Sequence, residues 1–329
     1  MKLPLSVLDL SPVGAGVSPR QAIRDSVELA KTADELGFVR YWFAEHHNMA
    51  SIATSAPEIL IAHVAAVTQR ISVGAGGMMI PNHAPLHVIE QFRTLEALYP
   101  GRIDLGLGRA PGTDPVTSRA LRRGGAGEVN SQLAELFAFE RRMFPESHAF
   151  AQIEPMPSDV LLKSLWMLGS TLDGAQIAAQ LGVRYAFAGH FAMRHAVQAI
   201  RHYKTHFEPT ADVASPYAIL AVTAVCADTA EEAHRLAAPL RVAIVKNRTG
   251  RRAPIVSIEE ALAYEFSPEE QAIADDFFLG AVIGEPAHVA EQLHALARET
   301  MADEIMLSTL VPSLEARKGS LARIVRAMS

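Results

Sequence analysis

Short apolar runs alternate with longer amphipathic runs along almost the whole chain. The first apolar run, 5–10, precedes an amphipathic stretch at 19–37 whose apolar residues recur at helical spacing. Ser18 stands ahead of that stretch and Gly37 closes it, and these residue types favour the start and the end of a helix. The same pairing of runs recurs, so the pattern predicts repeated strand-then-helix units.

Eight such units are predicted. Strands are expected at 5–10, 38–43, 71–80, 102–108, 164–170, 184–189, 217–226 and 303–309, and helices at 19–37, 56–70, 85–101, within 128–144, and at 172–182, 191–207, 229–245 and 312–328. Helical connections of this length make consecutive strands parallel. Eight units are the number found in a (β/α)8 TIM barrel, so we predict one α/β barrel domain over 1–329.

A doubly wound open sheet is the main competing fold. Its first strand–helix turn would carry a dinucleotide fingerprint, but "DLSPVGAGVSP" has only a loose Gly-x-Gly and lacks the third glycine. The stretch 246–278, between units seven and eight, is too polar and too long for a simple loop. We expect an insertion there, with two short helices behind a flexible basic stretch, and insertions of this kind often cover an active site.

Composition narrows the class of protein. The chain has 329 residues, is 49% hydrophobic and 20% charged, and carries a formal charge of −6, which is typical of a soluble globular protein. An acidic balance disfavours a nucleic-acid partner. The basic runs at 119–125 and 246–252 sit beside glycines and are expected to be loops. The chain has no run of about 18 apolar residues, so no membrane span is predicted. No signal peptide is recognisable either, so a cytoplasmic location is expected.

Disulfide and metal chemistry are disfavoured. The single cysteine, Cys226, lies in the apolar run "AILAVTAVC" and is expected to be a buried hydrophobic residue. His83 and His87 in "HAPLH" have a spacing that could place two metal ligands on one turn. Pro85 stands between them and no acidic residue completes the ligand set, so no metal is expected.

The candidate catalytic groups follow the predicted strands. In a barrel the functional side chains gather at the carboxyl ends of the strands. "YWFAEHHN" (41–48) ends the second strand with His46 and His47. Neighbouring residues in an extended segment face opposite ways. We therefore expect one imidazole to point into the mouth of the barrel and the other to be structural, hydrogen-bonded to loop backbone.

Two further motifs suggest a phosphorylated ring compound. The glycines of "SVGAGG" (72–77) would suit either tight packing or a flat ring against the backbone. Arg109 ends the fourth strand, and Gly169, Ser170 and Thr171 precede a helix, where free N–H groups bind anions. Ser170 or Thr171 could equally be a plain helix cap. Because strands four and five are neighbours in a barrel, both features would meet at one phosphate, as in flavin mononucleotide (FMN).

Two hydrolase classes are disfavoured by what the chain lacks. No paired carboxylates stand at the strand ends, as glycoside hydrolysis requires. No Gly-x-Ser-x-Gly nucleophile elbow is present.

Four segments together resemble a known family. "YWFAEHHN", "VGAGGMMIPNHAP", "GRIDLGLGRAPG" and "LGSTLDGAQIAAQLGVRYAFA" are similar, in order and spacing, to the bacterial luciferase-like flavin-dependent monooxygenases, and most similar to small members of unknown substrate. The resemblance runs from Leu5 to about Ser313. It implies a TIM barrel with a flavin site at its mouth. It also implies a two-component enzyme, in which a separate flavin reductase supplies reduced FMN and O2 oxidises a small organic substrate.

The resemblance also implies roles for individual residues. His46 matches the catalytic histidine, and Gly76–Gly77 match a non-prolyl cis peptide beneath the flavin ring. Arg109 matches the phosphate-binding arginine. The rest of the phosphate site matches Gly169, Ser170 and the backbone near Gly174, while 246–278 matches a mobile lid. Family members usually carry serine at the position of Gly174, so weak FMN binding is expected, which suits a flavin that shuttles between proteins.

Several alternatives stay open at this point. Relatives that use the deazaflavin F420 have similar motifs, so an F420-dependent dehydrogenase is the second hypothesis; a non-catalytic flavin carrier and a metal-dependent hydrolase are the third and fourth. Relatives form dimers through their second and third helices, and a homodimer is expected here. The apolar face for that contact is expected from Ala56, Ile59, Leu60, His63, Val64, Val88, Phe92 and Leu95.

Overall fold

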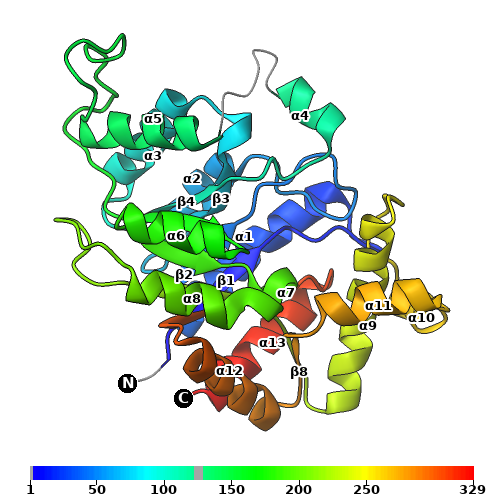
Figure 1. Ribbon diagram of the computed structural model, residues 1–329. Coiled ribbons are helices and arrows are strands. Elements are labelled where there is room, and N and C mark those ends of the chain that lie inside the picture. The colour runs from blue at the N-terminus through cyan, green and yellow to red at the C-terminus, as the bar shows by residue number, and fades with distance from the viewer. Residues whose placement is uncertain (1–2, 122–128) are drawn as a thin grey trace.

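A closed barrel of eight parallel strands forms the centre of the molecule. The computed structural model describes residues 3–121 and 129–329. The strands are ordered β6-β5-β4-β3-β2-β1-β9-β7, and β6 pairs with β7 to close the ring, while β8 lies beyond β7. Helices surround the strands (Figure 1). The TIM barrel predicted from the alternation of apolar and amphipathic runs is therefore confirmed.

The elements follow the predicted order closely. The strands are β1 (Leu5–Asp9), β2 (Arg40–Phe43), β3 (Ser72–Met79), β4 (Ile103–Gly108), β5 (Leu165–Gly169), β6 (Arg184–Phe187), β7 (Ala218–Cys226), β8 (Val282–Gly284) and β9 (Glu304–Ser308). The longer helices are α1 (Pro19–Leu36), α2 (Pro57–Val67), α3 (Pro85–Leu98), α5 (Val129–Arg141), α6 (Leu172–Gln180), α8 (Ala196–Thr205), α9 (Ala230–Arg248), α11 (Pro268–Phe277), α12 (Pro286–Thr300) and α13 (Leu314–Ala327). Shorter helical pieces are η1 (Ile80–Asn82), α4 (Pro115–Leu121), α7 (Gly189–Ala192), η2 (Met193–His195) and α10 (Ile258–Leu262).

Local sequence signals explain where several helices begin and end. The Ser18 hydroxyl accepts a hydrogen bond from the backbone N–H of Gln21, so it caps α1 as predicted. Gly37 ends that helix with φ of 83°, a left-handed conformation that glycine adopts without steric cost. The single helix expected at 191–207 is instead broken into α7, η2 and α8.

The seventh unit departs from the prediction. The helix expected to cross from strand seven to strand eight, at 229–245, is α9, but α9 packs against α10 and α11, outside the ring (Figure 1). The place in the ring between α8 and α13 is taken by α12, which packs against both of them. The short strand β8 and the helix α12 were not predicted. The insertion therefore begins with α9 rather than after it.

The interior of the barrel is charged at the amino ends of the strands and apolar further along them. Trp42 and Trp166 pack edge to face, with ring centroids 5.2 Å apart, among small and aliphatic side chains from β1, β6, β7 and β9. At the amino ends of the strands, the Arg40 guanidinium pairs with the buried carboxylates of Asp104 at 3.0 Å and Glu304 at 3.1 Å. This polar cluster fills the end of the barrel at the amino ends of the strands, opposite the cavity that opens at their carboxyl ends.

The face expected to support a dimer is mostly inside the monomer. Leu60, Val64, Val88, Phe92 and Leu95 are buried against the barrel, so they are not available to a partner chain. This part of the prediction was wrong because the apolar stripe of an outer helix faces the strands first.

Cys226 is buried, as predicted. Among the described residues, no helix is long and apolar enough to cross a membrane.

Candidate active site

A cavity of about 550 Å³ opens at the carboxyl ends of the barrel strands. We call it the barrel-mouth cavity. Its floor is the apolar barrel interior, including Leu8, Trp42 and Met306, and its rim carries polar groups from the loops that follow β2, β4, β5 and β6. A volume of this size lies within the ~300–1,000 Å³ of typical small-molecule sites.

Most of the sequence-predicted site residues meet at this cavity. His46, Gly76, Arg109, Gly169 and Ser170 all line it. The strand pairing explains why: β2 to β6 are consecutive neighbours in the ring, so the residues that follow them share one rim.

Gly77 and Gly174 lie behind the wall. A Cβ on Gly77 would lie 2.8 Å from the carbonyl oxygen of Gly106, and one on Gly174 would lie 3.2 Å from Cα of Gly169. The peptide bond between Gly76 and Gly77 is cis, as the resemblance implied.

Close packing accounts for the glycine at position 76. A Cβ there would lie 2.9 Å from both the Leu8 Cδ1 and the Trp42 Cε3 atoms, too close for either to stay in place. The register of β3 against β4 also shifts between Gly76 and Met78, which is the bulge that glycine in a strand often marks. Tight packing therefore explains why no side chain stands there, and the bare backbone still forms part of the cavity wall.

Arg109 and the start of α6 converge, as the strand order predicted. The Arg109 guanidinium forms an ion pair with Asp173, in the first turn of α6, at 2.5 Å. Thr171 rather than Ser170 is the cap residue of this helix, although its 3.5 Å bond to the Gly174 N–H is long. Ser170 and Thr171 line the cavity next to the helix start. One cation and the free N–H groups of a helix N-terminus thus face one space, which suits an anion.

His46 is held as a neutral base. Its Nδ1 lies 3.1 Å from the carbonyl oxygen of Gly112. A carbonyl only accepts, so Nδ1 carries the proton and Nε2 is left as an acceptor. Burial lowers the pKa of His46, although the bond to Gly112 opposes that effect. At neutral pH the ring is therefore uncharged and able to take up a proton at Nε2.

Glu45 organises the wall beneath His46. Its buried carboxylate accepts hydrogen bonds from the Met79 backbone N–H at 2.7 Å, from the Asn82 side chain at 2.9 Å, and lies 2.8 Å and 2.9 Å from His47 and His83 Nε2. Burial raises the pKa of Glu45, but these hydrogen bonds outweigh it and the net shift is downward. The carboxylate thus ties the β2 loop to the end of β3.

The division of roles between the two histidines differs from the prediction. The backbone-bonded histidine is His46 itself, whereas His47 binds the Glu45 carboxylate. In the described part of the chain, no group of three or more His, Cys, Asp or Glu side chains is arranged to hold a metal ion.

His190 is the group on the rim whose hydrogen bonding is incomplete. It follows β6, lines the barrel-mouth cavity and packs against Phe191. Its Nδ1 is buried without a hydrogen-bond partner among the described residues. Burial, and then the nearby His46, lower the pKa of His190 to about 4. A neutral imidazole with an open nitrogen at a cavity wall is a place where a ligand can hydrogen-bond.

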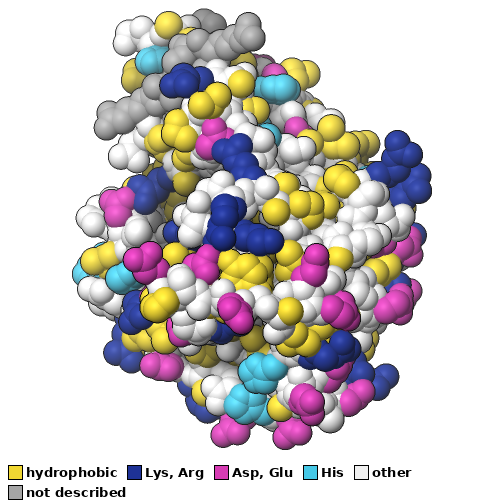
Figure 2. Space-filling model, turned by 90° about the vertical axis from the view of Figure 1, so that its right-hand side faces the viewer, with side chains coloured by type: hydrophobic (Ala, Val, Ile, Leu, Met, Phe, Trp, Pro, Cys, Tyr) yellow, Lys and Arg dark blue, Asp and Glu magenta, His cyan; other side chains and the backbone are white. Residues whose placement is uncertain are grey.

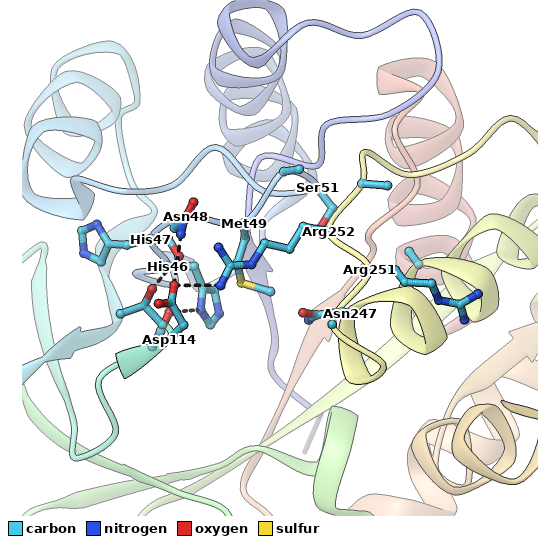
Figure 3. Close-up of a pocket in the computed structure, with 15 residues that line it drawn as sticks. His46, His47, Asn48, Met49, Ser51, Asp114, Asn247, Arg251 and Arg252 are labelled. Carbon is cyan, nitrogen blue, oxygen red and sulfur yellow. Dashed lines mark hydrogen bonds and ion pairs between the residues drawn. The ribbon is translucent and has the colours of Figure 1, made fainter. Parts of the chain in front are cut away.

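A second cavity, of about 360 Å³, lies on the other side of His46. We call it the insertion-side cavity. It is enclosed by the loop 46–51, by 112–114, and by residues of α9 and 250–253, as Figure 3 shows. The two cavities share His46 and Gly112 in their walls. Sequence reasoning missed this cavity.

The roof of the insertion-side cavity is anchored to the barrel. Ile255 is buried, and its backbone exchanges hydrogen bonds of 2.9 Å with Val13 and Ala15 in the loop after β1. Arg252 pairs with Asp114 at 2.9 Å and Arg251 pairs with Glu270. The basic stretch expected to be a flexible loop is thus partly helical, within α9, and partly held by ion pairs; the other basic run, 119–125, falls largely outside the described residues.

Figure 2 views the molecule from the side of α9, α10 and α11. Lys and Arg side chains gather near the middle of this face, and Asp and Glu side chains lie mainly around and below them. Residues 246–278 carry basic side chains at their start, 246–252, and acidic side chains further along, from Glu259 to Asp276, so the positive charge of this segment is confined to its first residues.

The fold and the cavity define the class of protein: an α/β-barrel enzyme whose site lies at the carboxyl ends of the strands. The family model described as luciferase-like monooxygenase matches residues 3–304. A luciferase-like monooxygenase of Escherichia coli strain K12 is 41% identical over 95% of this chain and 93% of its own length. The chain therefore belongs to the luciferase-like monooxygenase family and is a flavin-dependent monooxygenase.

Solved structures agree with this assignment. A crystal structure of apo-MsnO8 is 34% identical, covers 99% of this chain and 98% of its own, and has a TM-score of 0.88. The oxygenating constituent of 3,6-diketocamphane monooxygenase of Pseudomonas putida, in complex with FMN, is 18% identical and has a TM-score of 0.71, with coverage of 100% of this chain and 98% of its own. At that identity the likeness concerns the fold alone.

Proposed function

We propose that this enzyme is the oxygenating component of a two-component system that uses reduced FMN, supplied by a separate reductase, and O2 to oxidise a small organic molecule. One observation carries the proposal: Arg109, the start of α6 and His46 surround a single apolar cavity at the barrel mouth. Reduced FMN, when bound, supplies the two electrons with which one oxygen atom of O2 enters the substrate and the other leaves as water.

The residues present fit a phosphorylated ring compound. Arg109 and the N–H groups at the start of α6 would hold the phosphate, and the apolar floor with the bare backbone of Gly76 would receive the ring. The buried, unpartnered Nδ1 of His190 is an open hydrogen-bonding position in the same wall. The distant relative solved with FMN supports the same choice of cofactor.

His46 would control the proton in this site. The bond from its Nδ1 to Gly112 fixes the ring, and the lowered pKa keeps Nε2 ready to accept a proton. Such a group can hold back the proton whose arrival releases hydrogen peroxide before the substrate is oxidised. The apolar floor of the cavity supports this by excluding water.

The insertion and the oligomeric state are parts of the same proposal. The segment 246–278 would act as the cover of the site, since its residues 250–253 stand over the cavity next to His46. A homodimer would have to use exposed groups such as Ile59 on α2, because most of the apolar residues once expected in the contact are buried.

Deazaflavin F420 is the alternative cofactor, and one observation supports it. An F420-dependent secondary alcohol dehydrogenase has the same fold, with a TM-score of 0.67 at 14% identity. F420 chemistry would require no O2. Mixing the protein with each reduced cofactor under air therefore separates the two, because only reduced FMN should consume O2 quickly.

The phosphate contact gives the direct test of FMN binding. Arg109→Ala removes a charged hydrogen-bond donor, so FMN affinity should fall by about 1.5–3 kcal/mol, roughly 10- to 100-fold. Quenching of FMN fluorescence on titration with protein measures the dissociation constant. Loss of the partly exposed Arg109–Asp173 ion pair should change the free energy of unfolding by only about 0–1 kcal/mol.

Arg248→Ala is the matched control. This arginine is exposed at the end of α9 and makes no ion pair with any residue that the structure describes. It removes the same charge from the chain without touching the cavity. Equal FMN affinity of wild type and Arg109→Ala would contradict the phosphate site, and with it the proposed use of FMN.

A further inference from the structure

We propose that the insertion-side cavity binds the carboxylate end of the organic substrate, which we infer to be a small carboxylic acid with a short apolar chain. The inference rests on the proposed function, because it names the substrate class of the same enzyme. Two observations support it. The insertion-side cavity is lined by hydrogen-bonding and charged groups, and it shares His46 with the barrel-mouth cavity.

The lining of this cavity is amphipathic. Met49, Ala50, Ala243 and Ala253 supply apolar surface, enough for a short hydrocarbon chain. Asn247 lies one helical turn after Ala243, so both project from the same face of α9. The Asn247 amide makes no side-chain hydrogen bond within the described residues, and in Figure 3 it lies between the two arginines. A molecule with a polar head and a short apolar tail matches such a lining.

Arg252 has hydrogen-bonding capacity to spare. One of its terminal nitrogens, Nη2, pairs with Asp114 Oδ2 at 2.9 Å. A guanidinium carries five N–H groups in a planar fork, and within the described part of the chain the others have no partner. Figure 3 shows the Arg252 side chain reaching across the cavity toward Asp114 and His46. The remaining edge of the fork is available to a carboxylate, the group that its geometry fits best.

Asp114, by contrast, has no capacity left. Its Oδ1 accepts the backbone N–H groups of Val116 and Thr117, at 3.0 and 3.1 Å. Its Oδ2 accepts the Thr117 hydroxyl at 2.7 Å and the Asn48 amide at 3.0 Å, in addition to Arg252. A carboxylate offers about four lone-pair positions, and four hydrogen bonds already use them, while Arg252 balances the charge. A ligand ammonium would find no free acceptor on Asp114, so the site selects an anion rather than a cation.

The second arginine does not contribute. The Arg251 side chain points away from the cavity in Figure 3 and pairs with Glu270, which does not line the cavity. One guanidinium, held in place by Asp114, therefore faces the space. A single positive fork suits one carboxylate better than a phosphate dianion, which distinguishes this site from the Arg109 end of the barrel-mouth cavity.

The position of the site connects recognition to chemistry. His46 and Gly112 belong to the walls of both cavities, so a molecule held by its carboxylate at Arg252 has its other end directed to the imidazole wall. Arg252 acts as a binding residue at a distance from the reacting atoms. Its loss should therefore raise KM for such a substrate and leave kcat nearly unchanged.

Binding of a simple probe to the flavin-free protein tests the proposal. Hexanoate is compared with hexanamide and hexylammonium, which have the same chain and different heads, by saturation-transfer NMR. Hexanoate should bind at least about tenfold more tightly than either, the worth of a charged hydrogen bond. Arg252→Gln should remove that preference and Arg252→Lys should keep part of it. The exposed Arg248→Gln, at the end of α9, should bind hexanoate like the wild type.

Asp114→Asn gives a change of opposite sign. The amide oxygen can still accept the N–H groups of Val116 and Thr117 that Asp114 now accepts, but the charge that competes with the ligand is gone, so hexanoate should bind about threefold or more tightly, within the range of a partly exposed ion pair. Unaltered thermal unfolding of each variant checks that the fold is kept. Equal binding of hexanoate and hexanamide, an unaltered Arg252→Gln, or preference for hexylammonium would each overturn the carboxylate site.

The outcome is separable from that of the proposed function. FMN titration on the same samples reports on the barrel-mouth cavity alone, and Arg252→Gln should not change it. FMN binding without hexanoate binding rejects the carboxylate site and keeps the flavin proposal. Hexanoate binding that depends on Arg252, in a protein that fails to bind FMN, rejects the flavin proposal and keeps the carboxylate site.

Discussion

Each of the two cavities carries one arginine paired with an aspartate at the start of a helix, yet the two pairs differ in how firmly the aspartate is held. Asp173 is 67% exposed and pairs with Arg109 at 2.5 Å, with no further hydrogen bond among the described residues. Asp114 accepts four hydrogen bonds besides its contact with Arg252. The first aspartate is free to leave its arginine for water, whereas the second is fixed by its other hydrogen bonds.

The difference teaches what each arginine is able to bind. Arg109 can give its whole fork to an incoming group once Asp173 swings away, which suits a phosphate that arrives and leaves with a shuttled cofactor. Arg252 is paired with an Asp114 that its other hydrogen bonds hold in place, and it offers its remaining edge, which suits a single carboxylate. His46 lies in the wall between the two cavities, so both ligands would lie next to it.

The largest expected effect comes from replacing His46, which lines both cavities. His46→Ala removes the neutral base that faces both, so the release of hydrogen peroxide from the reduced, FMN-loaded protein in air should rise by roughly 100-fold, the lower end of a general acid–base contribution. Peroxide is measured after rapid mixing of that protein with air-saturated buffer. FMN titration and hexanoate binding serve as controls and should change by less than about twofold. Equal rates of peroxide release from wild type and variant would remove His46 from proton control.

The same comparison shows which part of the site was predictable from sequence. The barrel-mouth cavity could be predicted because strand order alone makes the residues after β2 to β6 neighbours. The insertion-side cavity could not be predicted, because it forms where the loops 46–51, 112–114 and 250–253 come together. No periodic pattern in the sequence indicates which loops are neighbours. Arg251 and Arg252 are alike in sequence, and only packing turns one toward Glu270 and the other toward Asp114.

The fold was predictable for a related reason, with one instructive exception. Apolar periodicity shows that a helix buries one face, but not what it buries that face against. Both α9 and α12 bury such a face, so the apolar pattern predicts α9, the first in the chain, as the ring helix, whereas the structure places α12 there. The strand β8 has only three residues, Val282–Gly284, which is too short for the alternation that identifies a strand.

A second prediction sharpens the contrast in polarity between the cavities. His190 lines only the barrel-mouth cavity, and its pKa is lowered to about 4, against about 6.5 in an unfolded chain. Above pH 6.5 both states are neutral. Between pH 6.5 and 4 His190 takes up a proton in the unfolded chain but not in the folded protein, so its contribution to the free energy of unfolding falls as the pH falls and levels off below pH 4.

His190→Gln should therefore lose less stability on acidification than the wild type. Each pKa unit corresponds to about 1.4 kcal/mol, and partial access of the ring to solvent reduces the total, so we expect a difference of about 1–2 kcal/mol between pH 7 and 4. Urea midpoints measured across that range give the curve. His234→Gln, on the exposed side of α9, controls for the loss of a surface histidine. Parallel curves for wild type and His190→Gln would show that His190 is not held neutral by burial.

The smallest effect bears on the difference between the two aspartates. If Asp173 leaves Arg109 when phosphate binds, Asp173→Asn removes a competitor, and FMN should bind about two- to fivefold more tightly, within the ~0–1 kcal/mol of an exposed ion pair. Asp173 also stands in the first turn of α6, where a negative charge favours the helix by about 0.3–1 kcal/mol, so the same variant should be slightly less stable. Fluorescence titration and thermal unfolding measure the two changes. Weaker FMN binding by the variant would instead mean that Asp173 holds Arg109 in place for the phosphate, and that the two pairs work alike.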